Sequence, residues 1–385
     1  MKGLLLRLFG LGAQDRRVLF LLGPLFALAT ASSVIVATFT KALFLSANDL
    51  SVMPWMFLGA SGFTAFASVG YVMLMQRMEM QTRFTALLLC AVVTFSALRL
   101  LYPLDEKIMS FVLFVWCTGV GHLILIQMWN LSSGLLPARQ GKRLFPVFAA
   151  ISTLGAAAGG GIVQSVVALN VSAHDLVWVS VVLLMVPLVR VRTVIRELAS
   201  ALPVAAVEPV ASPGRRGGKA LASLKNSSEV VRGARSLLES PLLTRLAVFV
   251  FLMQIASVLV DYIFSAELKG AFPNNAALAG FLGQYYGLSN LMAFGFALFA
   301  SSRMVRVVGI GLAVASSAGI IAIGSAAYLA LSLGFTTGSA FWAIAACSFG
   351  ERIVSFALSR NAMQMLVTPI ETRKGERAKT LIDGV

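Results

Sequence analysis

Several charged or titratable side chains lie inside long apolar stretches of this 385-residue sequence. A charge at the centre of a hydrocarbon layer costs about 3 kcal/mol on insertion scales, so such residues mark substrate paths, ion pairs or gates. Arg99 and Arg360 lie near the ends of their apolar runs and can extend toward water, so we interpret these two as structural. The residues concerned are Lys41, Arg99, His122, Asp261, Glu351, Arg352 and Arg360.

One polar stripe surrounds Arg352. Ser348, Arg352, Ser355 and Ser359 are separated by four, three and four residues, which places them on one face of a helix. Arg352 is the best single candidate for holding an anionic substrate group, because a guanidinium binds anions through forked, charge-assisted hydrogen bonds. Glu351 lies about 100° around the same helix. It is either a gating or coupling group that pairs with another span, or part of a structural clamp on a cation.

Two further charges occupy similar depths, toward the outer ends of their spans. An ion pair between Lys41 and Asp261 would neutralise both and could act as an outer gate; a purely structural buried pair is the equal alternative. Lys41 would also give a central cavity positive character and bind substrate. His122 is either a hydrogen-bonded residue at a helix contact or a proton carrier that couples transport.

Two uncharged motifs complete the set of candidates. Gln284, Tyr285 and Asn290 could stack on and hydrogen-bond a ring or base, or else bind neighbouring helices together. Gly155 and Gly159, four residues apart among alanines, indicate close helix packing. The sequence contains no HExxH motif, no Cys/His cluster and no nucleophile–base spacing, so we predict neither an enzyme nor a metal or cofactor site.

The composition indicates the fold class that positions these residues. The chain is 58% hydrophobic and 12% charged, whereas soluble domains carry about 25% charged residues. Apolar runs of membrane-spanning length, about 20 residues each, recur throughout. We therefore predict an all-α polytopic membrane protein with about ten transmembrane helices, at residues 18–45, 51–75, 84–102, 108–134, 144–169, 175–193, 242–267, 278–300, 304–332 and 339–366.

The basic residues predict the orientation of these spans. With the N-terminus in the cytoplasm, 25 of the 31 Lys and Arg residues fall in cytoplasmic segments and only Lys107 and Lys269 in outer loops. This bias follows the positive-inside rule of a bacterial-type inner membrane. The same bias explains the net charge of +15, because the basic residues form a cytoplasmic surface that faces the lipid headgroups. We therefore predict no nucleic-acid partner.

The layout suggests two parallel repeats. A Pro-, Gly- and Ala-rich linker loop, 194–241, separates a six-span repeat, 1–193, from a four-span repeat, 242–385. The candidate charges fall on the first and fourth spans of each repeat, the pattern of a major-facilitator-like helix bundle. The second repeat then lacks its last two spans, and the final "AKTLIDGV" resembles the start of another helix. We expect a truncated chain or a shortened relative; the alternative is a complete ten-span protein.

Three segments carry a family resemblance. "LLPARQGKRLFPVFAAISTLGAAAGG" (135–160), the segment 259–311 containing Asp261-Tyr262, and "SRNAMQMLVTPIETRKGERAKTLIDGV" (359–385) resemble ATP/ADP-translocase-like proteins, a nucleotide transporter family related to the major facilitators. The resemblance implies a twelve-span fold and exchange of ATP against ADP through a basic central site. Two departures are the missing spans and "MQRMEMQTR", which lacks the Gly-x-x-x-Asp-Arg pattern of ordinary major facilitators.

Two functions remain open at this stage. The first is a secondary transporter of an organic anion, in which Arg352 and Lys41 bind the substrate while two repeats rock around a site near the midplane. The second is a non-transporting membrane scaffold or sensor that keeps the same fold and binds a partner through its cytoplasmic face. The mid-membrane Arg352 favours transport. Both hypotheses have the lipid bilayer as a partner, and the first adds a small anionic substrate such as a nucleotide.

Overall fold

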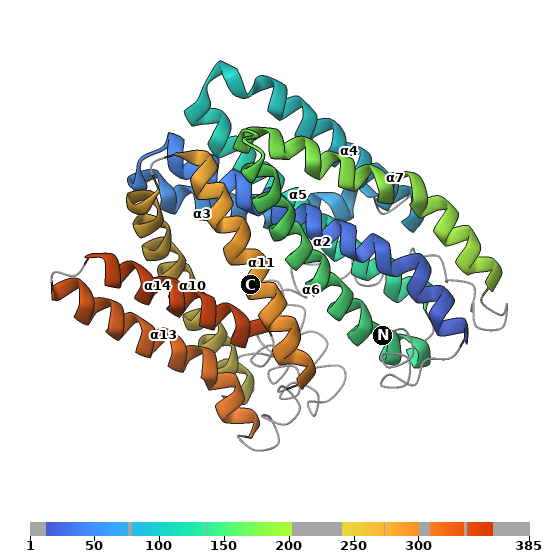
Figure 1. The fold of residues 1–385 in the computed structure, drawn as a ribbon. Helices are drawn as coiled ribbons and strands as arrows, with labels where there is room; N and C mark the ends of the chain where they lie inside the picture. Colours follow the sequence, from blue (N-terminus) through green and yellow to red (C-terminus); the bar gives the residue numbers. More distant parts are fainter. Residues whose placement is uncertain are drawn as a thin grey trace. The chain divides into compact units, whose positions relative to one another are not determined.

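The computed structural model describes residues 13–75, 79–136, 138–201, 241–272, 274–299, 309–334 and 337–356. Within these ranges the chain forms ten α-helices and no strand (Figure 1), which confirms the all-α prediction. Three features named above lie outside the described residues: Arg360, most of the 194–241 loop, and the C-terminal "AKTLIDGV".

The ten helices follow the predicted apolar runs in order. Their bounds are α2 Ala13–Ala47, α3 Met53–Met75, α4 Met80–Leu101, α5 Glu106–Leu135, α6 Ala138–Ala168, α7 Leu176–Ala201, α10 Pro241–Ala271, α11 Asn275–Phe299, α13 Ile310–Leu333 and α14 Thr337–Val354. Short 3-10 helices at Leu50–Val52, Tyr102–Leu104 and Ala173–Asp175 lie in three of the connections.

Eight of these helices are long and apolar enough to cross a membrane, which confirms a polytopic membrane protein. The other two are α11 and α14, within the described residues. Polar residues explain the difference, because α11 contains the "GQYYGLSN" segment and the described part of α14 includes Glu351 and Arg352.

Several helices continue beyond their apolar runs. α6 begins at Ala138, six residues before its predicted span, and α7 continues to Ala201, eight residues after its own. A helix satisfies its own backbone hydrogen bonds, so it can extend from the hydrocarbon layer into water once its side chains become polar. Asp105 marks the start of α5, where its carboxylate accepts hydrogen bonds of 3.0 Å from the backbone N–H groups of Lys107 and Ile108.

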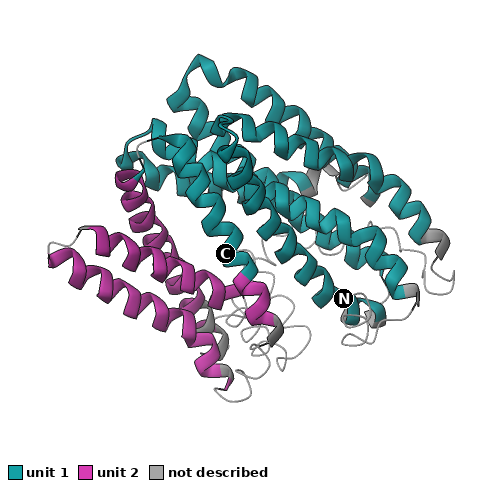
Figure 2. Ribbon diagram, in the orientation of Figure 1, with its two compact units in different colours: residues 1–213, 272–291 teal, residues 214–271, 292–385 magenta. Residues whose placement is uncertain are grey.

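The chain divides into two compact units (Figure 2). Unit 1 comprises Met1–Pro213 together with Phe272–Leu291, and unit 2 comprises Gly214–Ala271 together with Met292–Val385. Helix α11 is therefore shared, with residues up to Leu291 in unit 1 and residues from Met292 in unit 2. The predicted repeat boundaries, 1–193 and 242–385, stay a prediction.

Helix α2 is the centre of unit 1, where it packs against α5, α6 and α7. Its side chains Phe26, Phe39 and Phe44 are almost fully buried. A pair of buried hydroxyls adds a polar contact within this apolar core, because Ser32 Oγ on α2 and Ser180 Oγ on α7 lie 2.6 Å apart. α3 packs on α5, and α4 packs on both α5 and α7.

Glycines on α6 bring two neighbouring helices very close. A methyl group added at Gly155 would lie 2.6 Å from the Cα of Ala27, and one added at Gly159 would lie 2.9 Å from the Cα of Ala31. The backbones of α6 and α2 are therefore in direct contact, which supports the packing role of the two glycines.

The next glycine of α6 faces a different helix. A methyl group at Gly160 would overlap the backbone of α11 at Gly283 and would lie 2.5 Å from the Cα of Gly287. In turn, a methyl group at Gly287 would lie 3.2 Å from the carbonyl oxygen of Ala157. α6 thus presents small residues on two sides, one toward α2 and the other toward α11.

In unit 2, α14 packs against α13 and α10. The Sγ atom of Cys347 on α14 lies 3.7 Å from the carbonyl oxygen of Ile320 on α13. A polar contact joins α13 to α10, because the Tyr328 hydroxyl donates a 2.8 Å hydrogen bond to Glu267 Oε1.

Candidate functional site

Lys41 lies near the C-terminal end of α2, with its side chain buried to 4% exposure. Phe26 and Phe44 mark the side of α2 that faces α5, since they contact Trp129 and Phe114, whereas Ala27 and Ala31 mark the side that faces α6. Helical spacing places Lys41 between these two sides.

Three residues that precede Lys41 in α2 lie on the same face of the helix. Thr30, Ser33 and Ala37 are partly accessible, although most neighbouring residues of α2 are buried. The hydroxyl of Thr30 donates to the carbonyl oxygen of Phe26 at 2.8 Å and so stays close to the helix. These residues therefore form a partly accessible stripe along an otherwise buried helix.

A second stripe runs along α5. Thr118, His122, Trp129 and Ser133 follow one another at spacings of four, seven and four residues and so lie on one helix face. His122, Trp129 and Ser133 are exposed, and Thr118 is partly accessible. Thr118 Oγ1 is buried and has no hydrogen-bond partner within the described part of the chain.

The two stripes run alongside each other because α2 and α5 are antiparallel neighbours. Contacts between Asn48 and Ser110, at 2.7 Å, and between the rings of Phe26 and Trp129, at 4.9 Å, set this register. The register brings Lys41 to within about one turn of the level of Thr118. We call the eight residues the α2–α5 lane: Thr30, Ser33, Ala37, Lys41, Thr118, His122, Trp129 and Ser133.

His122 lies halfway along α5. Its Nδ1 atom is 2.8 Å from the carbonyl oxygen of Thr118, one turn earlier in the same helix. This contact fixes the ring on the helix surface. Within the described residues it involves no second helix, so the structure gives His122 no helix-joining hydrogen bond.

The three polar residues predicted on α11 do not share one environment. Tyr285 and Asn290 are buried, at 8% and 7% exposure, and Asn290 Nδ2 donates a 2.7 Å hydrogen bond to the carbonyl oxygen of Tyr286. Gln284 is exposed and lies on the same face as Leu288 and Leu291, which are about half exposed. Gln284 is therefore separated from the other two.

In unit 2, the predicted site residues lie on α10 and α14. Glu351 Oε1 accepts a 3.2 Å hydrogen bond from Ser257 Oγ, so this carboxylate contacts α10. The guanidinium carbon of Arg352 lies 6.0 Å from the centre of the Phe356 ring, within the range of a cation–π contact. Asp261 lies on α10, where its backbone carbonyl oxygen accepts a 2.6 Å hydrogen bond from Ser265 Oγ.

The predicted Lys41–Asp261 gate joins residues of different units. Lys41 belongs to unit 1 and Asp261 to unit 2, so their pairing stays a prediction. The described residues contain no group of three or more His, Cys, Asp or Glu side chains that could hold a metal ion.

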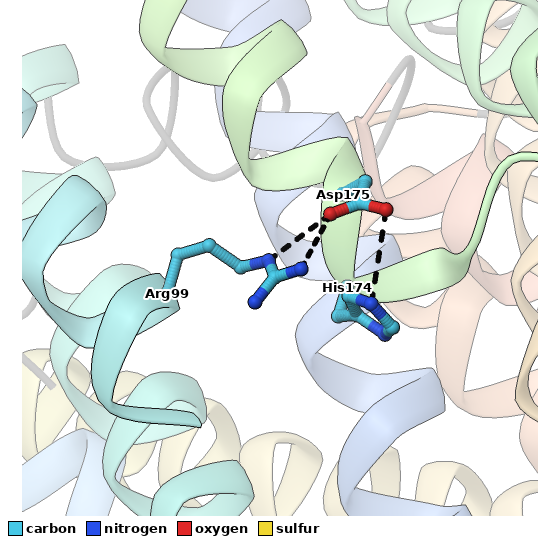
Figure 3. A network of polar contacts seen from close by, with 3 residues as sticks. All are labelled: Arg99, His174 and Asp175. Atoms are coloured by element: carbon cyan, nitrogen blue, oxygen red, sulfur yellow. Dashed lines mark hydrogen bonds and ion pairs between the residues drawn. The ribbon is translucent and has the colours of Figure 1, made fainter. Parts of the chain in front are cut away.

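Sequence reasoning missed one charge cluster, which Figure 3 shows. Arg99 on α4 donates hydrogen bonds from Nε, at 3.2 Å, and from Nη2, at 2.6 Å, to Oδ1 of Asp175 just before α7. Oδ2 of Asp175 lies 3.7 Å from His174 Nε2, and the His174 ring stacks on Tyr102 with a centroid distance of 5.9 Å. Arg99, which we interpreted as structural, thus has Asp175 as its partner at the helix end, and the sequence did not indicate that partner.

A second network was also missed, at the opposite end of unit 1. Asp15, in the first turns of α2, is buried to 3% exposure and accepts a 3.0 Å hydrogen bond from Gln140 Nε2 on α6. Arg143 Nη2, on the next turn of α6, lies 3.5 Å from the other carboxylate oxygen. The signal in the sequence was an acidic residue at the start of one span and basic residues at the start of another, both on the predicted cytoplasmic side.

Comparison with known proteins identifies the family. The model of the TLC ATP/ADP transporter family matches residues 32–365, which include Lys41, His122, Asp261, Glu351 and Arg352. A comparison with curated proteins gave no match. The family match confirms both the resemblance to ATP/ADP-translocase-like proteins and the prediction of a membrane transporter. The chain belongs to the TLC ATP/ADP transporter family.

Proposed function

We propose that this protein exchanges ATP against ADP across a bacterial-type inner membrane, with its N-terminus in the cytoplasm. Its two helical repeats alternate access to a central path, and the α2–α5 lane forms one wall of that path. The chain carries out no chemistry on the nucleotide. The family match and the eight membrane-length helices support this proposal.

The observation that carries the proposal is the buried cation Lys41. Its side chain is 4% exposed, although it lies on a helix long and apolar enough to cross the membrane. Ionisable residues on membrane helices mark substrate and ion paths. During transport a nucleotide phosphate on the α2–α5 lane interacts with this ammonium, and the Lys41–Asp261 pair forms the outer gate.

Arg352 supplies a second cation from unit 2. A guanidinium binds a phosphate through paired hydrogen bonds, which an ammonium cannot do, so Arg352 orients the phosphate group while Lys41 attracts it. Glu351, bonded to Ser257 on α10, sets the position of this part of α14. Alternating access then moves the phosphate between the two cations and the two sides of the membrane.

Proteoliposomes loaded with ADP and supplied with labelled ATP test the proposal. Wild-type protein should accumulate label only when ADP is inside, and Lys41→Ala should lower the exchange rate by roughly tenfold to a hundredfold, the cost of a lost charge-assisted hydrogen bond. Lys41→Arg, which keeps the charge, should retain more activity. The matched control is Lys107→Ala, which removes an exposed lysine outside the helix interior. Exchange that is unchanged in Lys41→Ala would eliminate the assigned role.

A further inference from the structure

Trp129 combines a fixed ring with an open surface. Its ring meets Phe26 on α2 edge-on at 4.9 Å and Phe145 on α6 at 6.0 Å. Phe26 is itself almost fully buried and stacks on Phe148 at 4.9 Å, so the support beneath Trp129 belongs to the core of unit 1. Even so, Trp129 remains 36% exposed. An aromatic ring held on two sides and open on the rest is a preorganised stacking surface.

The surroundings of Trp129 distinguish it from a tryptophan that faces lipid. Trp178 on α7 has a similar exposure of 40%, but it shares its helix face with exposed aliphatic residues such as Val182 and Val189. That face is typical of lipid contact. The face of Trp129 carries His122 and Ser133, with Ile126 as its exposed aliphatic neighbour. Ionisable side chains on membrane helices usually face the bundle interior or a water-filled cavity, so the face with His122 differs in kind from that of Trp178.

Hydrogen-bonding groups flank the ring. His122, two turns away and roughly 10 Å along the axis, presents an imidazole fixed by its contact with the Thr118 carbonyl oxygen. Asn130 follows Trp129 in the chain, about 100° around the helix, and its Nδ2 lies 3.5 Å from Gln127 Oε1. Amide groups can both donate to and accept from the edge of a base.

We propose that Trp129 is the stacking surface for the base of the transported nucleotide. The inference rests on the proposed nucleotide exchange and adds the position of the base subsite on the α2–α5 lane. The base stacks on the open part of the indole ring, between His122 and Asn130. Since every base presents a π-face, Trp129 contributes affinity for nucleotides in general, and discrimination among bases falls to the neighbouring amides.

Exchange kinetics provide the first test. Trp129→Ala should raise the KM for ATP about tenfold, because one base-stacking contact is lost. Trp129→Phe, which keeps a ring, should stay within about threefold of wild type. Trp178→Ala removes an equally exposed tryptophan from the aliphatic face and should leave KM unchanged. An unchanged KM in Trp129→Ala overturns the base subsite. Absence of nucleotide exchange in the wild-type protein overturns the proposed function instead.

Fluorescence provides a second test that does not depend on how well Trp129→Ala folds. The chain has five tryptophans, and replacing the other four with Phe leaves Trp129 as the only indole. ATP and ADP should quench its emission, whereas inorganic tripolyphosphate, which has no base, should not. If this variant exchanges nucleotide without any quenching, the base does not stack on Trp129. Equal quenching by tripolyphosphate would show a response to phosphate alone and would likewise refute the inference.

Discussion

At the residue scale, charged side chains inside the apolar helices act in two different ways. Arg99 makes hydrogen bonds of 2.6 and 3.2 Å to Asp175 and holds the end of α4 against the start of α7. Lys41 on α2 and Arg352 on α14 are cations of two predicted membrane spans. The first group stabilises unit 1, and the second group serves the transported anion in our proposal.

The Arg99–Asp175 contact should be measurable as a coupling free energy. Arg99→Ala, Asp175→Ala and the double variant form a cycle in which we expect about 1 kcal/mol of coupling, because the pair is hydrogen-bonded but Asp175 is partly open to solvent. Denaturation of purified protein in mixed micelles measures it. ATP exchange by the folded variants should remain near wild type. A loss of exchange without a loss of stability would instead assign Arg99 to the transport path.

Arg352 should behave in the opposite way. Arg352→Ala should lower ATP exchange by roughly tenfold to a hundredfold while thermal stability changes little. Arg352→Lys should recover only part of the rate, since an ammonium cannot form the paired hydrogen bonds of a guanidinium. Arg192→Ala, on an exposed position of α7, is the control. Normal exchange in Arg352→Ala would require another residue to bind the phosphate.

Individual charges could be located from the sequence, but their partners could not. The apolar runs placed Lys41 inside a helix of membrane-spanning length, and they put Glu351 and Arg352 inside a predicted span. Arg99 and Asp175 are 76 residues apart, and no local pattern connects them. The same holds for the exposure of His122 and Trp129, which depends on where neighbouring helices run. Helical spacing gives the face of each residue but not the neighbour opposite that face.

At the element scale, α6 packs closely against two helices, α2 and α11, through its glycines. Its Gly155 and Gly159 contact the backbone of α2, and its Gly160 contacts the backbone of α11. The run "GAAAGGG" thus serves two interfaces, one more than the packing role expected from its sequence. Helix boundaries were predicted to within several residues, since apolar length marks the hydrocarbon layer and not the end of the helix.

Substitutions on α6 test this arrangement directly. Gly155→Ala and Gly159→Ala place a methyl group against backbone atoms that cannot rotate away, so each should cost about 1–3 kcal/mol. Gly161→Ala is the matched control, because nothing lies within 4 Å of the added methyl group. It should be neutral or slightly stabilising, since alanine favours a helix more than glycine. The unfolding midpoints of the three variants measure this difference. Equal midpoints would contradict the close contact between the backbones of α6 and α2.

At the scale of the whole molecule, α11 belongs to both compact units. Residues up to Leu291 group with unit 1 and residues from Met292 with unit 2. The linker-like composition of 194–241 suggested that the chain would divide there into two independent repeats. Composition cannot show that a helix after the linker packs with helices before it, because that contact depends on glycines more than 100 residues apart.

Splitting the chain tests this division of α11. Fragment 1–213 produced alone lacks the glycine contacts of α11 on α6, so its unfolding midpoint should be lower than in the presence of fragment 214–385. Co-produced fragments should copurify through a tag on one of them and should restore ATP exchange. Fragment 1–213 with an unchanged midpoint when alone would show that α11 contributes nothing to unit 1.

The shared helix also limits how such proteins can be recombined. Gly160 lies directly against the backbone of α11 at Gly283 and Gly287, and a side chain at Gly160 would overlap that backbone. A chimera joined within 202–240 would pair α6 of one parent with α11 of another. Such hybrids should assemble when the parent that supplies α6 has glycine at 160 and the parent that supplies α11 has glycine at 283 and 287. These two segments must therefore be matched whenever they come from different parents.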